Sequence, residues 1–326
     1  MYFRALKKNT LNRLFKLNKV NLLMILKSAK STLNSKIVTL IVTCLFALAS
    51  NAQIVFENSI TGSNPNTSNP YTIGQSFNSN MTVTGIGRGS GITGSNGNNR
   101  YSANNWTQGA SSDNNDYFYW TLTPAQCYEI DFSNLAITFE RNANGPQNFA
   151  LRSSLDNYSS NVWTFNFNST AVQSSTISLA AASFQNITSN ITFRIYGWSS
   201  AAGTGTFSIN SFVFNGSVNA APSPVAGLIA GSSSVCPGTS ASLTLVGSTG
   251  NIQWQISNDN ISFSNIGGAT SSIYLTPNLS GTAYYRAAVS LGNCPTVFSP
   301  SFTVNITPSS ITPTGASSCG PSSVVL

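Results

Sequence analysis

A pair of carboxylates with a spacing suited to acid–base chemistry lies in the most regular stretch of the chain, residues 126–156. Glu129 and Asp131 are two residues apart, so on a strand they share one face at a separation of about 7 Å. Glycoside hydrolysis uses carboxylate pairs of this kind. However, they alternate with the apolar Tyr128, Ile130 and Phe132, and the solvated face of a half-buried sheet has the same pattern. We therefore expect a sheet face here and no catalytic residue.

Other common catalytic groups are missing from the sequence. The chain contains no histidine, and its last lysine is Lys36. Serine–histidine catalysis, lysine Schiff bases and histidine zinc sites are therefore excluded for the rest of the chain. The composition favours a non-catalytic protein without a cofactor.

A segment rich in oxygen ligands comes just before a predicted strand. Asp113 and Asp116 enclose two asparagines, and Ca²⁺ prefers such carboxylate and amide oxygens. The spacing is not that of an EF-hand, and Asx-rich turns also form for backbone reasons alone. A structural calcium ion and a plain turn both remain open.

Aromatic residues are the third group that could do chemistry. Within residues 117–122, alternation puts Phe118, Trp120 and Leu122 on one side and Tyr117, Tyr119 and Thr121 on the other. One set must be core. The other set, with Trp106 in an Asn-rich segment and Trp198 at the start of a loop, predicts a platform on which sugar rings stack. Core or rim packing of each ring is the alternative.

The elements that would position these residues are strands. Residues 126–156 alternate apolar and polar side chains, which predicts a meander or hairpin on the inner wall of an antiparallel sandwich. Strand after strand without a long helix predicts a jelly-roll-like β-sandwich over residues 53–218. Residues 85–105 are rich in Gly, Asn and Ser, so we expect a long exposed loop there. The predicted strands lie near residues 75–77, 82–85, 117–122, 128–132, 135–141, 148–152, 164–167, 191–196, 206–209 and 212–214.

The positive charge of the chain is concentrated at its start. The formal net charge is +7, but nine of the cations lie within residues 1–36, before an apolar run over residues 37–49. This arrangement predicts a signal peptide over residues 1–52, cleaved after Ala52, with Met24 as an alternative start. After Ala52, six arginines oppose eight carboxylates, a net charge of −2. With so few cations, the mature chain is not expected to bind nucleic acid. The apolar run is too short for a membrane span, and the mature chain is expected to have no transmembrane helix.

A second domain is predicted over residues 225–307, after a linker at residues 219–224. The order Cys236, Trp254, Cys294, with alternating strands around them, matches an Ig-like sandwich. A Cys236–Cys294 disulfide is expected in an exported chain and would stabilise it by about 4 kcal/mol; two free thiols are the alternative. Cys127 is interpreted as a small buried hydrophobe.

The end of the chain echoes the start of that domain. Residues 318–326 repeat the pattern of residues 235–243, so residues 308–326 are predicted to be the truncated start of a further Ig-like repeat. On this interpretation Cys319 takes the place of Cys236. The chain is then the front part of a longer protein.

Two resemblances add to these predictions. The motifs VCPGTSASLTL, IQWQ and LTPNLSGTAYYRAAV, with the later Cys294, resemble the Ig-like repeats of large exported Bacteroidetes surface proteins. FYWTLTPAQCYEIDFSNLAITFER and ITFRIYGW resemble jelly-roll modules at the front of exported bacterial multidomain proteins. The resemblance implies secretion or display on the outer surface of a Gram-negative cell, by the type IX route.

Together these features predict a non-catalytic surface protein. Its first domain is expected to bind an extracellular glycan or a surface protein, displayed on Ig-like spacers. Two alternatives remain open: the non-catalytic front part of a longer exported hydrolase or protease, and a purely structural stalk.

Overall fold

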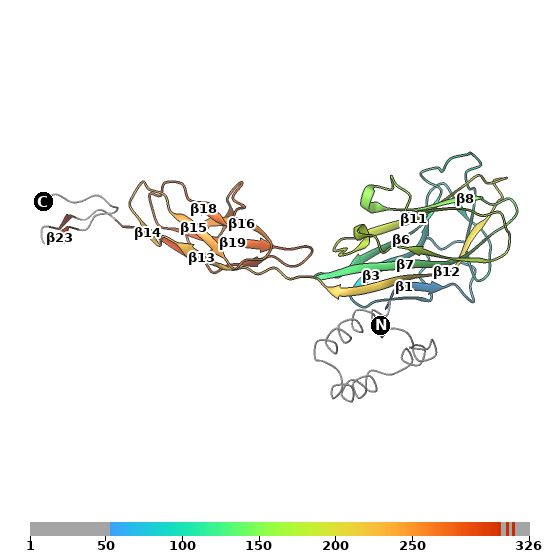
Figure 1. Ribbon diagram of the computed structural model, residues 1–326, viewed down its shortest axis with the longest axis horizontal. Helices are drawn as coiled ribbons and strands as arrows, with labels where there is room; N and C mark the ends of the chain where they lie inside the picture. Colours follow the sequence, from blue (N-terminus) through green and yellow to red (C-terminus); the bar gives the residue numbers. More distant parts are fainter. Residues whose placement is uncertain (1–52, 308–310, 313–314, 317–326) are drawn as a thin grey trace, which may run out of the picture. The chain divides into compact units, whose positions relative to one another are not determined.

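The structure, a computed structural model, describes residues 53–307, 311–312 and 315–316. Strands dominate this part of the chain, and the predicted all-β sandwich class is confirmed (Figure 1). The predicted signal peptide, its cleavage after Ala52, and Cys319 lie outside the described residues. Of the predicted further repeat, only the short strands β22 (Ile311–Thr312) and β23 (Gly315–Ala316) are described. No helix in the described ranges is long and apolar enough to cross a membrane.

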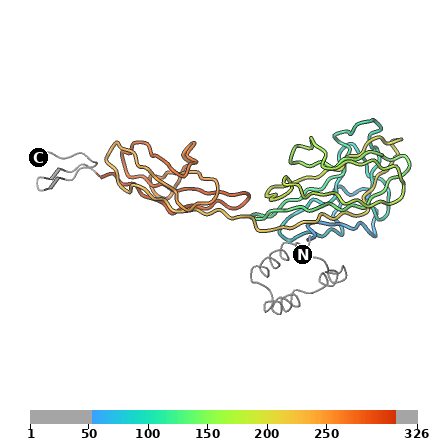
Figure 2. The backbone as a smooth tube through the Cα atoms, viewed as in Figure 1, coloured from blue at the N-terminus to red at the C-terminus, as the bar shows by residue number. Residues whose placement is uncertain are grey.

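The first sandwich consists of two antiparallel sheets. The seven-stranded sheet has the order β10 (Gln173–Ser178), β7 (Tyr128–Arg141), β12 (Phe207–Ala220), β1 (Gln53–Ser59) and β2 (Gln75–Phe77), with β5 (Tyr101–Asn104) beside β12 and β4 (Thr93–Gly94) beside β5. The five-stranded sheet has the order β3 (Met81–Arg88), β6 (Tyr117–Pro124), β11 (Ile191–Trp198), β8 (Asn148–Ser153) and β9 (Trp163–Asn166). Single 3₁₀ turns occur at η1 (Ser154–Asp156) and η2 (Ala182–Phe184). The first and last strands, β1 and β12, run side by side (Figure 2).

The core lies between these two sheets and is largely aromatic. In β6 the side chains of Phe118, Trp120 and Leu122 are fully buried, whereas those of the alternate residues are half-buried on the outer face. The ring centroids of Trp120 and Phe212, on opposite sheets, are 5.2 Å apart. Full burial of such a side chain stabilises the fold by roughly 1.5–3 kcal/mol. Phe118, Trp120 and Leu122 are therefore the core set of β6.

The pairing predicted for residues 126–156 is wrong, although the alternation is present. β7 belongs to the seven-stranded sheet and β8 to the five-stranded one, so the two strands do not form a hairpin. The connection crosses the edge of the sandwich, where the buried guanidinium of Arg141 donates to the carbonyl oxygens of Ala143, Gly145 and Asn168. Alternation identifies a buried face but not the strand that lies beside it.

Residues 85–105 are not the long exposed loop that their composition predicts. β3 runs on to Arg88, and β4 and β5 form a hairpin in this segment. The guanidinium of Arg88 is buried, stacks on the ring of Tyr101 at 3.9 Å, and donates to the carbonyl oxygens of Pro65, Ser68 and Ser102. Desolvation by burial lowers the pKa of Arg88. A buried cation with several hydrogen bonds thus organises this segment.

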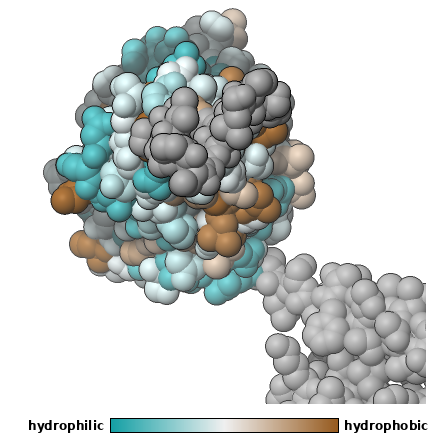
Figure 3. Space-filling view, turned by 90° about the vertical axis from the view of Figure 1, so that its left-hand side faces the viewer, coloured by the Kyte–Doolittle hydropathy of each residue, from teal (hydrophilic) through white to brown (hydrophobic). Residues whose placement is uncertain are grey.

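The second sandwich has its own core, centred on the fully buried Trp254. One sheet has the order β13 (Leu228–Gly231), β15 (Ser242–Val246), β18 (Ile273–Leu275). The other has the order β14 (Ser234–Val235), β21 (Phe302–Ile306), β19 (Ala283–Ser290), β16 (Asn251–Ser257), β17 (Ser264–Asn265), with β20 (Val297–Phe298) beside β19. Hydrophobic residues on the surface seen in Figure 3 occur as separate patches among hydrophilic ones.

The predicted Cys236–Cys294 disulfide is wrong, and so is the interpretation of Cys127 as a buried hydrophobe. Cys294 bonds to Cys127, 167 residues away in the sequence. The reason is that the chain leaves β12 beside Cys127: Ala220 pairs with Tyr128, and the backbone N–H of Ala221 donates to the carbonyl of Cys127. Cys294, in the segment after β19, lies beside Cys127 and bonds to it.

Asn293 strengthens that connection. Its side-chain oxygen accepts a hydrogen bond from the backbone N–H of Cys127 at 3.0 Å, and its amide nitrogen donates to the carbonyls of Ala125 at 2.9 Å and Tyr128 at 3.3 Å. The β19–β20 connection is therefore joined to the β6–β7 turn by a covalent bond and three hydrogen bonds.

We expect replacement of Cys127 and Cys294 by serine together to lower the free energy of unfolding by roughly 2–5 kcal/mol, because a long-range covalent constraint is lost. Urea unfolding of the full chain, followed by tryptophan fluorescence, measures this. Asn293→Ala in the disulfide-bonded chain serves as the partial variant and should cost about 1–3 kcal/mol. A double variant as stable as the parent would contradict the prediction.

Candidate functional site

Trp106 is not part of a surface platform, so this part of the prediction is wrong. Its side chain is only 1% exposed and meets the rings of Phe118 and Phe207 edge-on, with centroids 5.2 and 5.8 Å away. The indole N–H donates to the carbonyl of Ala103 at 2.9 Å. Because the preceding segment is the β4–β5 hairpin, it carries Trp106 into the core.

Tyr117, Tyr119 and Trp198 are half-buried and face outward from the five-stranded sheet. The tyrosines alternate with the core residues of β6, and Trp198 has the outward parity of β11. In the register of the sheet, Tyr117 lies opposite Tyr196, whose ring centroid is 5.3 Å away. Three of the four predicted residues therefore share one surface.

Gly87 on β3 and Gly89, just after the end of β3, make room for the two tyrosines. Gly87 is the direct partner of Tyr119, and a Cβ atom at Gly87 would overlap the ring of Tyr119. A Cβ atom at Gly89 would come within 2.9 Å of the ring of Tyr117. Glycine at these two positions therefore leaves space for the rings, whose planes are inclined at 67° to each other. The alternation of Gly85, Gly87 and Gly89 with other residues was the sequence signal for this, but glycine content alone predicted a loop.

Two arginines lie on the same surface, and neither is among the residues predicted to bind a ligand. Arg152 on β8 and Arg194 on β11 are direct partners across the strands. Like charges placed opposite each other destabilise a sheet, so their position is unfavourable for folding alone. Local conflicts of this kind are expected at functional sites. We call the outward surface formed by Tyr117, Tyr119, Arg152, Arg194, Tyr196 and Trp198 the aromatic face.

Arg194 is held between two rings. Its Cζ atom is 4.1 Å from the ring centroid of Tyr117 and 3.7 Å from that of Tyr158, and Nη1 donates to the hydroxyl of Tyr196 at 3.3 Å. Tyr158 comes from the loop after η1, where Asn157 and Tyr158 both have positive φ. No local pattern in the sequence places a loop residue over a strand residue, which is why Tyr158 was missed.

Arg152 extends the positive charge. Its Cζ atom lies 4.8 Å from the ring centroid of Tyr196, Nε donates to the Asn161 side chain at 2.7 Å, and Nη2 to the Ser112 hydroxyl at 3.3 Å. Tyr196 itself is only 2% exposed, because the surrounding rings and guanidinium groups cover it. Tyr196 thus forms the base of the aromatic face.

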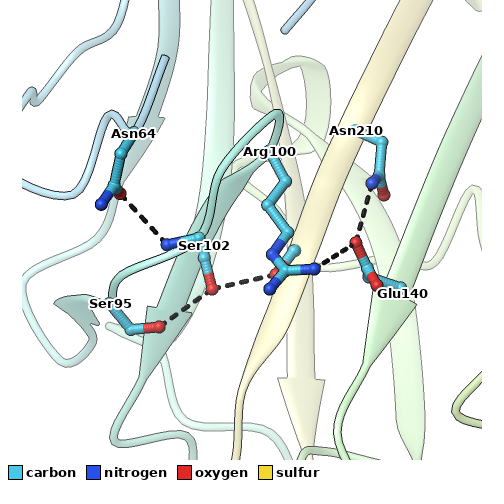
Figure 4. A network of polar contacts seen from close by, with 8 residues as sticks. Asn64, Ser95, Arg100, Ser102, Glu140 and Asn210 are labelled. Carbon is cyan, nitrogen blue, oxygen red and sulfur yellow. Dashed lines mark hydrogen bonds and ion pairs between the residues drawn. The ribbon is translucent and has the colours of Figure 1, made fainter. Parts of the chain in front are cut away.

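The charge of the aromatic face is not neutralised by a nearby carboxylate. Across the described ranges, the one ion pair joins Arg100 to Glu140 at 2.9 Å, and Glu140 also accepts from Asn210 (Figure 4). That pair lies on the other sheet. The aromatic face therefore carries two formal positive charges within a domain whose overall charge is negative.

The carboxylates of the flanking loops bond to backbone instead. The Asp156 carboxylate accepts from the backbone N–H of Ser160 at 2.9 Å, and that of Asp113 from the backbone N–H of Asn115 at 2.7 Å.

Burial raises the pKa of Tyr117. The charge of Arg194 opposes this increase, and the neighbouring tyrosines add to it. The raised pKa keeps the Tyr117 phenol neutral at neutral pH.

The two predicted calcium ligands accept hydrogen bonds from different parts of the chain. Asp116 is buried, and one of its oxygens accepts from both the backbone N–H and the hydroxyl of Thr107, each at 2.7 Å. Asp113 makes an Asx turn. The described part of the chain holds no group of three or more His, Cys, Asp or Glu side chains that could bind a metal. A structural calcium ion stays a prediction.

The carboxylate pair of β7 lies on the other sheet, away from the aromatic face. Asp131 accepts from the backbone N–H of Asn186 at 2.7 Å and from the amide of Asn219 at 3.1 Å. Burial, followed by the like charge of Asp131, raises the pKa of Glu129. The pair therefore shares one face, as its spacing predicts, but Asp131 is bound to its own domain.

Replacement of Asp116 by alanine is expected to lower the free energy of unfolding by roughly 1–3 kcal/mol, because Thr107 loses its acceptor. Asp113→Ala is the matched control, with an expected change below about 1 kcal/mol. Both are measured by chemical denaturation, with calcium and with a chelator. Stabilisation of the parent by calcium would support the metal site, and equal effects of the two substitutions would contradict the assignment of Asp116.

Residues 225–308 match a family described as a domain of unknown function (DUF8696). The matched range coincides with the second sandwich and covers a minor part of the chain. No curated protein matches the chain.

Solved structures show distant similarity. The glycoside hydrolase domain of Endo-D from Streptococcus pneumoniae R6 is 12% identical over 69% of this chain and 36% of that one, with a TM-score of 0.25. A β-1,2-glucanase from Parabacteroides distasonis is 15% identical over 79% and 39%, with a TM-score of 0.24. The adhesin domain of Epf from Streptococcus pyogenes is 12% identical over 67% and 80%, with a TM-score of 0.22. This chain thus spans well under half of the two hydrolases, and at these scores the similarities carry no functional argument.

Proposed function

We propose that this chain is a secreted or cell-surface protein whose first sandwich binds carbohydrate, without catalysis, through the aromatic face. The observation that carries the proposal is the placement of the outward, half-buried ring of Tyr119 over Gly87, its direct partner on the neighbouring strand, which has no side chain. An outward ring above a glycine offers an aromatic surface to a ligand. The apolar C–H face of a sugar ring stacks on such a surface.

The surroundings of these rings suit a sugar. The arginine N–H groups and tyrosine hydroxyls of the face supply donors and acceptors that fix the orientation of sugar hydroxyls. The rings belong to regular strands, which hold a binding site more rigidly than loops do. The second sandwich then serves as a spacer that displays the first.

The disulfide supports the proposed location. The Cys127–Cys294 bond requires an oxidising compartment, and such bonds are typical of exported proteins. The basic, apolar leader over residues 1–52 favours the same route. We include in the proposal display on the outer surface of a Gram-negative cell, as the Ig-like resemblance implies.

The test of carbohydrate binding is a glycan array probed with the full chain, with and without calcium. Tyr119→Ala should weaken binding to a positive glycan about tenfold, which corresponds to roughly 1.4 kcal/mol, because a stacking surface is lost. Tyr284→Ala removes a half-buried tyrosine from β19 of the second sandwich and should leave affinity unchanged. An array with no bound glycan, or equal loss in both variants, would overturn the proposal.

A second variant tests the ring position without removing a ring. Gly87→Ala places a methyl group where the ring of Tyr119 lies, so the ring must move and affinity should fall several-fold. The free energy of unfolding should change little, since the flexible end of Tyr119 can shift. Gly109→Ala is the control, because its added methyl would meet only Thr107 Cγ2 at 3.5 Å. Undiminished binding by Gly87→Ala would count against stacking on Tyr119.

A further inference from the structure

We infer that the carbohydrate bound by the aromatic face is acidic, and that Arg194 and Arg152 bind its negatively charged group. This inference rests on the proposed function and narrows its ligand class. The shared chemistry is a planar or tetrahedral oxyanion on the sugar, either a uronate carboxylate or a sulfate ester.

The part of Arg194 that can bind a ligand is the edge of its guanidinium group, where the N–H groups lie. Both faces of the guanidinium are covered, by Tyr117 at 4.1 Å and Tyr158 at 3.7 Å, so a ligand meets only the in-plane N–H groups. The described hydrogen bonds of Arg194 use Nη1 alone. Its Nε is buried from solvent, which leaves the edge that carries Nη2 for a ligand. A guanidinium edge matches two oxygens of a carboxylate or sulfate in the same plane.

Arg152 supplies the second charge. It is the direct cross-strand partner of Arg194, and its Nη2 makes only a 3.3 Å bond to Ser112. The two guanidinium groups repel each other while the face is empty. An anion between them removes that repulsion, whereas a neutral sugar does not, so the pair discriminates in favour of an acidic ligand.

The arrangement differs from ordinary structural stacking elsewhere in the chain. Arg286 in the second sandwich also lies between two rings, Phe263 at 4.1 Å and Phe298 at 4.2 Å, but its Nε is bonded to Gln255 Oε1 at 2.7 Å and no second arginine faces it. Arg286 therefore serves as a control with the same charge and similar ring contacts.

The experiment compares polygalacturonate with its fully methyl-esterified form, which keeps the sugar backbone but removes the charge. Binding of the full chain to each is measured by calorimetry at low and at physiological salt. Dextran sulfate and dextran form the second pair, so that sulfate and carboxylate recognition are told apart. We expect at least one acidic member to bind ten or more times tighter than its neutral partner, with affinity falling as salt rises.

Variants then assign the charge to residues. Arg194→Gln and Arg152→Gln should each weaken binding of the acidic polymer about tenfold or more, and Arg286→Gln by less than twofold. Arg194→Lys keeps the charge without the planar edge and should recover only part of the affinity. Thermal unfolding of each variant checks the fold. Arg152→Gln, which removes hydrogen bonds only to the side chains of Asn161 and Ser112, remains informative if Arg194 variants unfold.

The outcomes separate this inference from the proposed function. Binding of a neutral glycan with equal or greater affinity than any acidic one would leave carbohydrate binding intact and overturn acid recognition. An equal loss in Arg286→Gln would show general attraction of a polyanion and also overturn it. Failure of every glycan, acidic or neutral, to bind would overturn both.

Discussion

Aromatic packing between the two sheets of the first sandwich is the interaction on which the rest depends. Phe118 and Trp120 of β6 meet Phe207 and Phe212 of β12 across the core. Because side chains alternate along a strand, burying one set of β6 and β11 residues turns the other set outward. The rigid core thus determines where Tyr117, Tyr119 and the arginine of β11 point.

The aromatic face results from two local features that are unfavourable for a β-sheet. Gly87 weakens β3 but leaves room for the ring of Tyr119, and two arginines lie directly opposite each other on β8 and β11. Neither feature favours folding. Stacking of Arg194 between Tyr117 and Tyr158 offsets part of the repulsion. The proposed ligand chemistry follows from these unfavourable features, since an anion would remove the remaining repulsion.

The second constraint is the connection between the two sandwiches. The Cys127–Cys294 bond and the three hydrogen bonds of Asn293 join the β19–β20 connection to the β6–β7 turn. That turn follows directly on β6, the strand that carries Tyr117 and Tyr119. The proposed binding strand and the proposed spacer are therefore linked by a bond rather than by a flexible linker alone.

The sequence by itself determined the all-β class, most of the strands and the parity of β6, because alternation is a local property with a period of two residues. It placed Tyr117, Tyr119 and Trp198 correctly on an outward surface but sent Trp106 there as well. Only the tertiary structure decided that Arg152 lies beside Arg194, that Tyr158 covers Arg194, and that Cys294 bonds to Cys127. These contacts join residues distant in the sequence, and which strands and loops become neighbours depends on packing of the whole domain.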